Sequence, residues 1–193
     1  MGVQRLETFE GLIRRLVESF NSSGLDYMLT GALAASYYGT PRTTTDVDIM
    51  VKVGRKDLKS KLAPALEMAG LEVDQKKIEA ALRSGFRVVT FSDKESPFTV
   101  DIILSDRKLV KRPGTILGLS TFYQTPEELI LSKLRMIRAT IPRERALKDE
   151  DDIKAILKFT EVDIDALRKR AERDSTLPLL EALTANGDRQ YSP

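Results

Sequence analysis

Residues 46–53 (DVDIMVKV) form a β-branched, alternating segment that places two carboxylates on one face of a predicted strand. Successive side chains of a strand point to opposite faces, so Asp46 and Asp48 lie side by side while Val47 and Ile49 face a core. Their Cα atoms are then about 6.5–7 Å apart, at a rise of about 3.3 Å per residue. Two carboxylates so close repel unless water screens them or a cation binds between them. The segment therefore predicts either a solvated outer face or a site for a hard cation.

Cysteine and histidine are both absent from the 193 residues. Their absence excludes a disulfide framework, cysteine-ligated zinc or iron–sulfur sites, a thiol nucleophile and imidazole acid–base chemistry. Catalysis would have to use carboxylates, Lys, Arg, Tyr, hydroxyls and hard metal ions. The net charge of +2, from 31 basic and 29 acidic residues, is only mildly basic. It is well short of what a protein that coats DNA carries.

A third carboxylate, Asp101, lies in a second predicted strand at residues 98–104 (FTVDIIL). Val100 and Ile102 occupy one face of this strand and Asp101 the other. Aspartate is depleted in strands and costly to bury unpaired, so a lone one here is either an edge-strand safeguard against aggregation or part of a site. If the two strands are neighbours, all three carboxylates meet. Oxygen ligands without His or Cys select Mg²⁺ or Mn²⁺.

The order of the predicted elements is one helix, then strands mixed with helices, then helices alone. Hydrophobic periodicity and turn residues predict helices at residues 3–20, 31–38, 57–69, 75–84 and 125–138, and strands at 26–30, 46–53, 86–91 and 98–104. Two or three further helices are expected after residue 142. This order indicates an α/β fold with a helical C-terminal region. We expect an α/β core at residues 1–120, a helical region at 121–184 packed on it, and a flexible tail at 185–193, with a basic loop at 107–118 as the softest boundary.

A glycine, Gly31, follows the predicted strand at residues 26–30 and opens an Ala-rich helix. Glycine at such a turn lets the backbone approach a ligand closely, and a helix N-terminus offers free N–H groups to a phosphate. Thr30-Gly31-Ala32, thirteen intervening residues, Asp46-Val47-Asp48 and a later lone Asp101 together resemble the pattern of the DNA polymerase β-like nucleotidyltransferases. The runs GALAASYYGTPRTTTDVDIMV (31–51), TPEELILSKL (125–134) and DEDDI (149–153) are most similar to the AbiEii-type or minimal nucleotidyltransferase branch.

The resemblance implies a mixed β-sheet flanked by helices and a metal-dependent transfer of a nucleoside monophosphate. The donor would be a nucleoside triphosphate such as ATP, the acceptor a hydroxyl of RNA, tRNA, a protein or a small molecule, and the second product pyrophosphate. Asp46, Asp48 and Asp101 would be the catalytic residues and would hold Mg²⁺ or Mn²⁺. The residues expected to bind the nucleotide are Thr30, Gly31, Ala32, Arg42, Thr45 and Lys133.

Ala32 and Lys133 support the resemblance less directly than the other positions do. Ala32 departs from the family, which usually has Gly or Ser there, so no hydroxyl is available for a phosphate and only the backbone N–H remains. Lys133 lies within the apolar stripe of the helix at 125–138, where a lysine must snorkel to solvent, pair with an acid or meet an anionic ligand. Basic residues at 107–112 and 135–145 fit either an RNA acceptor or an ordinary solvated surface.

Three other functions stay open on the sequence: a non-catalytic nucleotide- or RNA-binding domain, the toxin-like enzyme of a toxin–antitoxin pair with an antitoxin partner, and a structural protein. The chain has no run of about 18 apolar residues, so we expect no membrane span. Charged residues among the first apolar ones are wrong for a secretory signal, and a cytoplasmic location is the default expectation.

Overall fold

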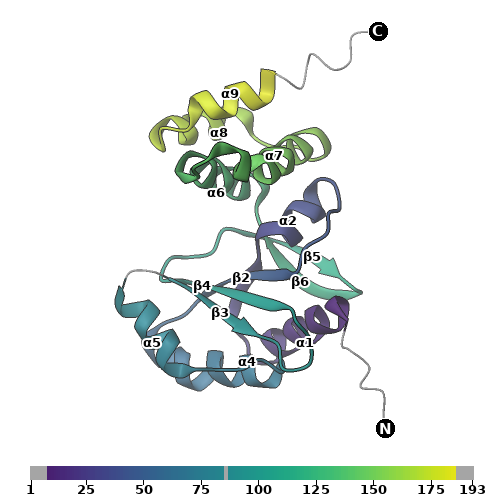
Figure 1. Ribbon diagram of the computed structural model, residues 1–193, viewed down its shortest axis with the longest axis vertical. Coiled ribbons are helices and arrows are strands. Elements are labelled where there is room, and N and C mark those ends of the chain that lie inside the picture. Colours follow the sequence, from purple (N-terminus) through teal and green to yellow (C-terminus); the bar gives the residue numbers. More distant parts are fainter. Residues whose placement is uncertain (1–7, 85–86, 186–193) are drawn as a thin grey trace. The chain divides into compact units, whose positions relative to one another are not determined.

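The computed structural model describes residues 8–84 and 87–185 and divides the chain into two compact units (Figure 1). Unit 1 consists of Met1–Leu33 and Thr43–Gln124, and unit 2 of Ala34–Arg42 and Thr125–Pro193. The chain crosses between them three times: within the helix α2 (Gly31–Tyr38), after Arg42 and after Gln124. No helix in the described part of the chain is both long and apolar enough to cross a membrane.

Unit 1 is built on one six-stranded mixed sheet with the strand order β3-β4-β2-β1-β6-β5. The strands are β1 (Asp26–Leu29), β2 (Asp46–Lys52), β3 (Val88–Ser92), β4 (Thr99–Ser105), β5 (Lys111–Ile116) and β6 (Leu119–Gln124). The pairs β2–β4 and β1–β6 are parallel, whereas β1–β2, β3–β4 and β5–β6 are antiparallel. The parallel β2–β4 pair is the one that carries the three predicted carboxylates.

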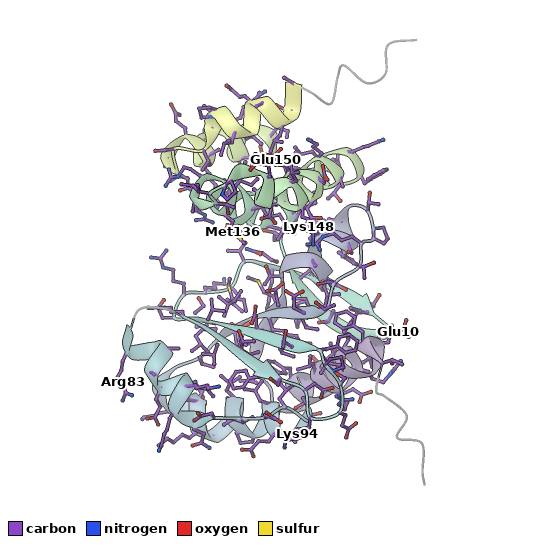
Figure 2. All side chains as sticks on the ribbon, viewed as in Figure 1. Glu10, Arg83, Lys94, Met136, Lys148 and Glu150 are labelled. Carbon is purple, nitrogen blue, oxygen red and sulfur yellow. The ribbon has the colours of Figure 1, made fainter. Side chains whose placement is uncertain are left out.

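Helices cover one side of this sheet (Figure 1). They are α1 (Phe9–Ser22), the continuous segment α3 (Arg55–Asp57), η1 (Leu58–Leu62, a π-helical turn) and α4 (Ala63–Met68), and α5 (Gln75–Ser84). Residues that alternate along β2 and β4, such as Ile49 and Ile102, are buried beneath them, which the period-2 pattern predicted. Charged side chains at the periphery, such as Arg83 and Lys94, point outward (Figure 2).

The predicted basic loop at residues 107–118 is wrong in part, because residues 111–116 form the edge strand β5. Pro113 and Gly114 both disfavour strands, so the local sequence does not predict one here. An edge strand tolerates proline, because one side of its backbone faces solvent and needs no N–H donor there. The hairpin turn to β6 has positive φ at Leu117 and Gly118, as a two-residue turn of this kind requires.

Unit 2 is helical, as predicted for the C-terminal region. Its elements after Gln124 are α6 (Pro126–Ala139), η2 (Arg143–Ala146, a 3₁₀ turn), α7 (Leu147–Phe159), α8 (Ile164–Arg173) and α9 (Leu177–Ala185). Pro126 occupies the first turn of α6, where its missing N–H costs nothing, and the Thr125 side chain makes no capping hydrogen bond. Glu128 pairs with Arg170 of α8, with 2.5 Å between nitrogen and oxygen. The predicted flexible tail lies, from residue 186 on, outside the described residues.

Candidate active site

The structure brings the three predicted carboxylates together on one face of the sheet. The parallel register of β2 and β4 pairs Asp48 with Asp101, and Asp46 lies two residues before Asp48 on the same face. Carboxylate oxygens of the three residues all lie within 4.8 Å of one another, and each residue is partly exposed. We call this group the carboxylate site, and the sheet face that carries it the carboxylate face.

Two threonine hydroxyls donate hydrogen bonds into the carboxylate site. Thr44, just before β2, donates to Asp46 Oδ1 at 2.5 Å, and Thr90 of β3 donates to Asp101 Oδ1 at 2.5 Å. A hydroxyl orients a carboxylate but brings no positive charge. The site therefore offers three converging anionic oxygens from accessible side chains, which is the donor set that Mg²⁺ or Mn²⁺ prefers. The residues present fit a divalent cation.

Gly31 packs directly against this site. Its φ is +56°, and a Cβ at this position would lie 1.8 Å from Asp48 Oδ2. Any side chain at residue 31 would thus collide with the carboxylate, in addition to the strain of a left-handed backbone. The backbone N–H of Thr30 also donates to the Asp48 carbonyl oxygen at 3.0 Å. The glycine lets the strand-to-helix turn approach the Asp48 carboxylate closely.

Thr30 and Ala32, on either side of Gly31, are both buried. The Thr30 hydroxyl donates to the side-chain oxygen of Gln124. Its side chain is therefore engaged within the core, and Ala32 has no polar side-chain atom. Any phosphate bound at this turn would have to use backbone N–H groups.

Two of the predicted nucleotide-binding residues, Arg42 and Lys133, belong to unit 2 and form a charge cluster with Asp149 and Asp152. Lys133 and Asp152 are the buried members of this cluster. The Lys133 ammonium lies 2.7 Å from Asp149 Oδ1 and 2.8 Å from Asp152 Oδ2, and its side chain is 5% exposed. Arg42 donates from Nε to Asp152 Oδ1 at 2.9 Å and from Nη2 to Oδ2 at 3.1 Å. Of the three possibilities for a lysine in the apolar stripe of α6, the structure displays the pairing with acids. Thr45 lies in unit 1, with an exposed side chain next to Asp46.

Sequence reasoning missed the hydrogen bonds that Thr44 and Thr90 donate to the carboxylate site, and the pairing role of Asp152. Thr44 stands two residues before Asp46, so its proximity was available from the spacing alone. Thr90 reaches Asp101 because the β3–β4 register places the two residues opposite each other. The register of β3 and β4 depends on the connection between them, and the amino-acid sequence of either strand alone does not determine it. The sequence shows Asp152 only as part of the acidic run at residues 149–153, whereas its 5% exposure and two cationic partners come from tertiary packing.

Solved structures with similar folds include an antibiotic-resistance factor and a nucleotidyltransferase-like protein. The crystal structure of ANT(2'')-Ia in complex with adenylyl-2''-tobramycin matches with a TM-score of 0.59 and 14% identity, over 96% of this chain and 100% of that one. The solution structure of the same antibiotic-resistance factor gives a TM-score of 0.57 and 14% identity, over 92% and 97% of the two chains. An antigenic nucleotidyltransferase-like protein from Paracoccidioides brasiliensis gives 0.56 and 16% identity, over 90% and 94%. No family model and no curated protein matches this sequence. The likeness confirms the prediction of a nucleotidyltransferase-like mixed α+β fold.

Proposed function

We propose that this chain is a metal-dependent nucleotidyltransferase that moves a nucleoside monophosphate from a nucleoside triphosphate to an acceptor hydroxyl. The observation that carries the proposal is the carboxylate site, whose oxygens lie within 4.8 Å of one another on a sheet of nucleotidyltransferase fold. A structural protein gains nothing from three adjacent like charges, because they repel one another. A divalent cation turns the same arrangement into a favourable one.

Asp46, Asp48 and Asp101 are the residues that would hold the cation. Bound there, Mg²⁺ or Mn²⁺ would supply positive charge that offsets the charge of the triphosphate and of the acceptor oxygen. In the transfer, the acceptor oxygen forms a bond to the α-phosphorus, and the bond from that phosphorus to the bridging oxygen of the β-phosphate breaks. Pyrophosphate leaves with the bonding electrons. The acceptor proton passes to solvent, and Asp101 favours its loss.

The phosphates would bind beside the turn at Gly31, through backbone N–H groups of Gly31 and Ala32. Phosphate binding by backbone N–H groups does not need a side-chain hydroxyl at residue 32, which is alanine here. The nucleotide contacts of Arg42, Thr45 and Lys133 stay predictions. Arg42 and Lys133 already bind carboxylates, so a phosphate that used either would have to compete with Asp149 or Asp152. The AbiEii-type branch, a toxin-like role with an antitoxin and an RNA or protein acceptor also stay predictions from the resemblance.

A second candidate is a nucleotide-binding protein of the same fold without transfer activity. The observation in its favour is the turn itself, because Ala32 has no hydroxyl and the Thr30 hydroxyl is engaged by Gln124. This candidate retains cation and nucleotide binding but releases no pyrophosphate.

The decisive experiment supplies the purified chain with each of four α-labelled nucleoside triphosphates, Mg²⁺ or Mn²⁺, and cell extract. We expect label to move from one or more of the nucleotides to an acceptor, with release of pyrophosphate, and to disappear with Asp48→Asn. Binding without transfer under both metals supports the second candidate. Neither binding nor transfer contradicts both.

A further inference from the structure

The carboxylate face is organised in rows that run across the strands. One row pairs Thr90, Asp101 and Asp48, and the row before it pairs Ser92, Thr99 and Asp46. The row after it is apolar and consists of Val88, Ile103 and Met50, with Met28 of β1 at its far end. Neighbouring rows on one face are about 6.6 Å apart, at about 3.3 Å per residue. An apolar strip thus lies one row from the carboxylate site.

The strip is accessible on its β3–β4 side. Val88 is 47% exposed, Ile103 and Met50 are partly exposed, and Met28 is buried at 3% exposure. A partly exposed valine, isoleucine and methionine in one row cost free energy in water, roughly in proportion to their exposed apolar area. Covering them with an apolar ligand would recover it.

The composition of the three rows disfavours one kind of ligand. The nine residues of the three rows on β3, β4 and β2 include three aspartates, and none of the nine is Lys or Arg. A nucleic-acid acceptor brings a phosphate for every nucleotide, and proteins bind those phosphates chiefly with Lys and Arg. The nearest cation on the same face of β2 is Lys52, one row beyond the apolar strip and two rows from Asp48. The three rows around the reacting hydroxyl therefore disfavour a phosphate next to it.

The strip lies on the other side of β2 from the proposed triphosphate site, which leaves room for an acceptor there. Gly31, where we propose that the triphosphate binds, follows β1 and contacts Asp48 on the β1 side of β2. Asp101, Ile103, Thr90 and Val88 lie on the opposite side of β2, on β4 and β3. The apolar strip is thus on the side left to the acceptor.

We propose, on the basis of the proposed function, that the acceptor is an uncharged hydroxyl compound whose reacting group adjoins an apolar ring or alkyl surface. That surface packs on Val88, Ile103 and Met50 while the hydroxyl reaches Asp101. A small molecule and a protein side chain such as tyrosine share this chemistry. An RNA acceptor does not.

The binding test uses the full chain with labelled methyl groups of Met, Ile and Val, observed by NMR in the presence of Mg²⁺. The probes are phenol, which joins a hydroxyl to an apolar ring, and ribose 5-phosphate, which joins hydroxyls to a phosphate. We expect phenol to shift the methyl signals of Val88, Ile103 and Met50, and ribose 5-phosphate to leave them in place. Val110 at 51% exposure and Met68 at 65% are matched controls elsewhere in unit 1.

Equal phenol shifts at Val110 or Met68 would overturn the proposal, because they would indicate unspecific contact with apolar surface. Shifts of the strip with ribose 5-phosphate alone would overturn it in favour of a phosphate-bearing acceptor such as RNA. This readout needs no catalysis, so it stands apart from any failure of the proposed function.

The transfer test compares Ile103→Asn with Val110→Asn, after the extract is separated into RNA, protein and low-molecular-weight fractions. We expect label in the protein or low-molecular-weight fraction, and these two fractions distinguish the possible sources. Ile103→Asn should lower transfer at limiting acceptor by about tenfold or more, the effect of losing one apolar contact with a substrate, with Mn²⁺ affinity unchanged, while Val110→Asn keeps full transfer. Label confined to RNA, or equal transfer by both variants, contradicts the proposal.

Discussion

Two groups of charged residues, one in each unit, differ in how their charges balance. In unit 2, Arg42 and Lys133 face Asp149 and Asp152 in a cluster whose two positive and two negative charges cancel. In unit 1, three aspartates converge within 4.8 Å, and the hydrogen-bond donors that reach Asp46 and Asp101 are neutral hydroxyls. The first group is complete in itself, whereas the second gains from an added cation.

This difference also separates structural from functional charge. Buried charges that cancel hold helices in place, and removal of one partner leaves the other desolvated without compensation. Accessible like charges repel one another and so destabilise the fold slightly when no ligand is bound. A cation that binds between them relieves this repulsion, and the relief adds to its affinity. Mutations in the two groups should therefore have opposite effects on stability. We expect the following changes, from the largest to the smallest.

Replacement of one carboxylate in the carboxylate site should abolish function and spare the fold. We expect Asp48→Asn to reduce transfer about 10³-fold, equivalent to about 4 kcal/mol of barrier. When a chelator removes divalent cations, the free energy of unfolding of the variant should equal or exceed that of the wild type, because one of the three like charges is gone. Urea unfolding with and without Mn²⁺ measures the second effect. The wild-type chain should gain about 2.7 kcal/mol when free Mn²⁺ is 100 times its Kd, and the variant much less. A destabilised variant in chelator would contradict the distinction.

Removal of one cation from the charge cluster should do the reverse. We expect Lys133→Met to lower the free energy of unfolding by about 3 kcal/mol, because Asp149 and Asp152 stay partly or wholly desolvated without the ammonium. The matched control is Lys154→Met. Lys154 is an exposed lysine of α7 whose pair with Asp151 is 3.8 Å long, so its loss should cost less than about 1 kcal/mol. Equal costs for both variants in urea unfolding would show that the cluster is not a structural unit.

A side chain at Gly31 tests whether the turn and the carboxylate site depend on each other. Gly31→Ala puts a Cβ on the Asp48 carboxylate, and we expect Mn²⁺ affinity to fall about 10- to 100-fold. Gly24→Ala is a close control, because Gly24 has φ +62° and no atom within 4 Å of the added Cβ. Both variants should lose about 1–2 kcal/mol of stability to left-handed strain. Gly31→Ala should lose more than that because of the collision with Asp48, and it alone should lose Mn²⁺ affinity in calorimetric titration. Unchanged affinity in Gly31→Ala would mean that the carboxylate can move aside freely.

The fold was largely predictable, and its failures have physical causes. Alternation in residues 46–53 and 98–104 gave both central strands and the face that carries each aspartate. Two strands, β5 and β6, were not predicted. β5 contains Pro113 and Gly114, whose low strand propensity is tolerated because β5 lies at the edge of the sheet. Edge position is a property of the whole sheet, and a local window of sequence does not contain it.

The candidate site likewise has features that the local sequence predicts and features that depend on the tertiary structure. Asp46 and Asp48 follow from the period of a strand, and their meeting with Asp101 was conditional on an adjacency that the parallel register supplies. Gly31 was noticed for the right conformational reason, but the group it approaches is Asp48. Lys133 was noticed because a lysine in an apolar stripe needs a partner. The identity of that partner depends on the packing of α6 against α7, which no spacing encodes.

The smallest expected effect concerns a hydroxyl that orients a carboxylate without changing the charge of the site. Thr90→Val keeps the shape and strand propensity of threonine but removes the donor to Asp101 Oδ1. We expect Mn²⁺ to bind about tenfold more weakly, as for other groups that orient metal ligands, with the free energy of unfolding within about 0.5 kcal/mol of wild type. Thr90→Ser should restore the affinity, because serine retains the donor. Ser92→Ala, on the same face of β3 and one row away, should leave it unchanged. If Thr90→Val binds Mn²⁺ as tightly as wild type, the hydroxyls are incidental and the carboxylates alone define the cation site.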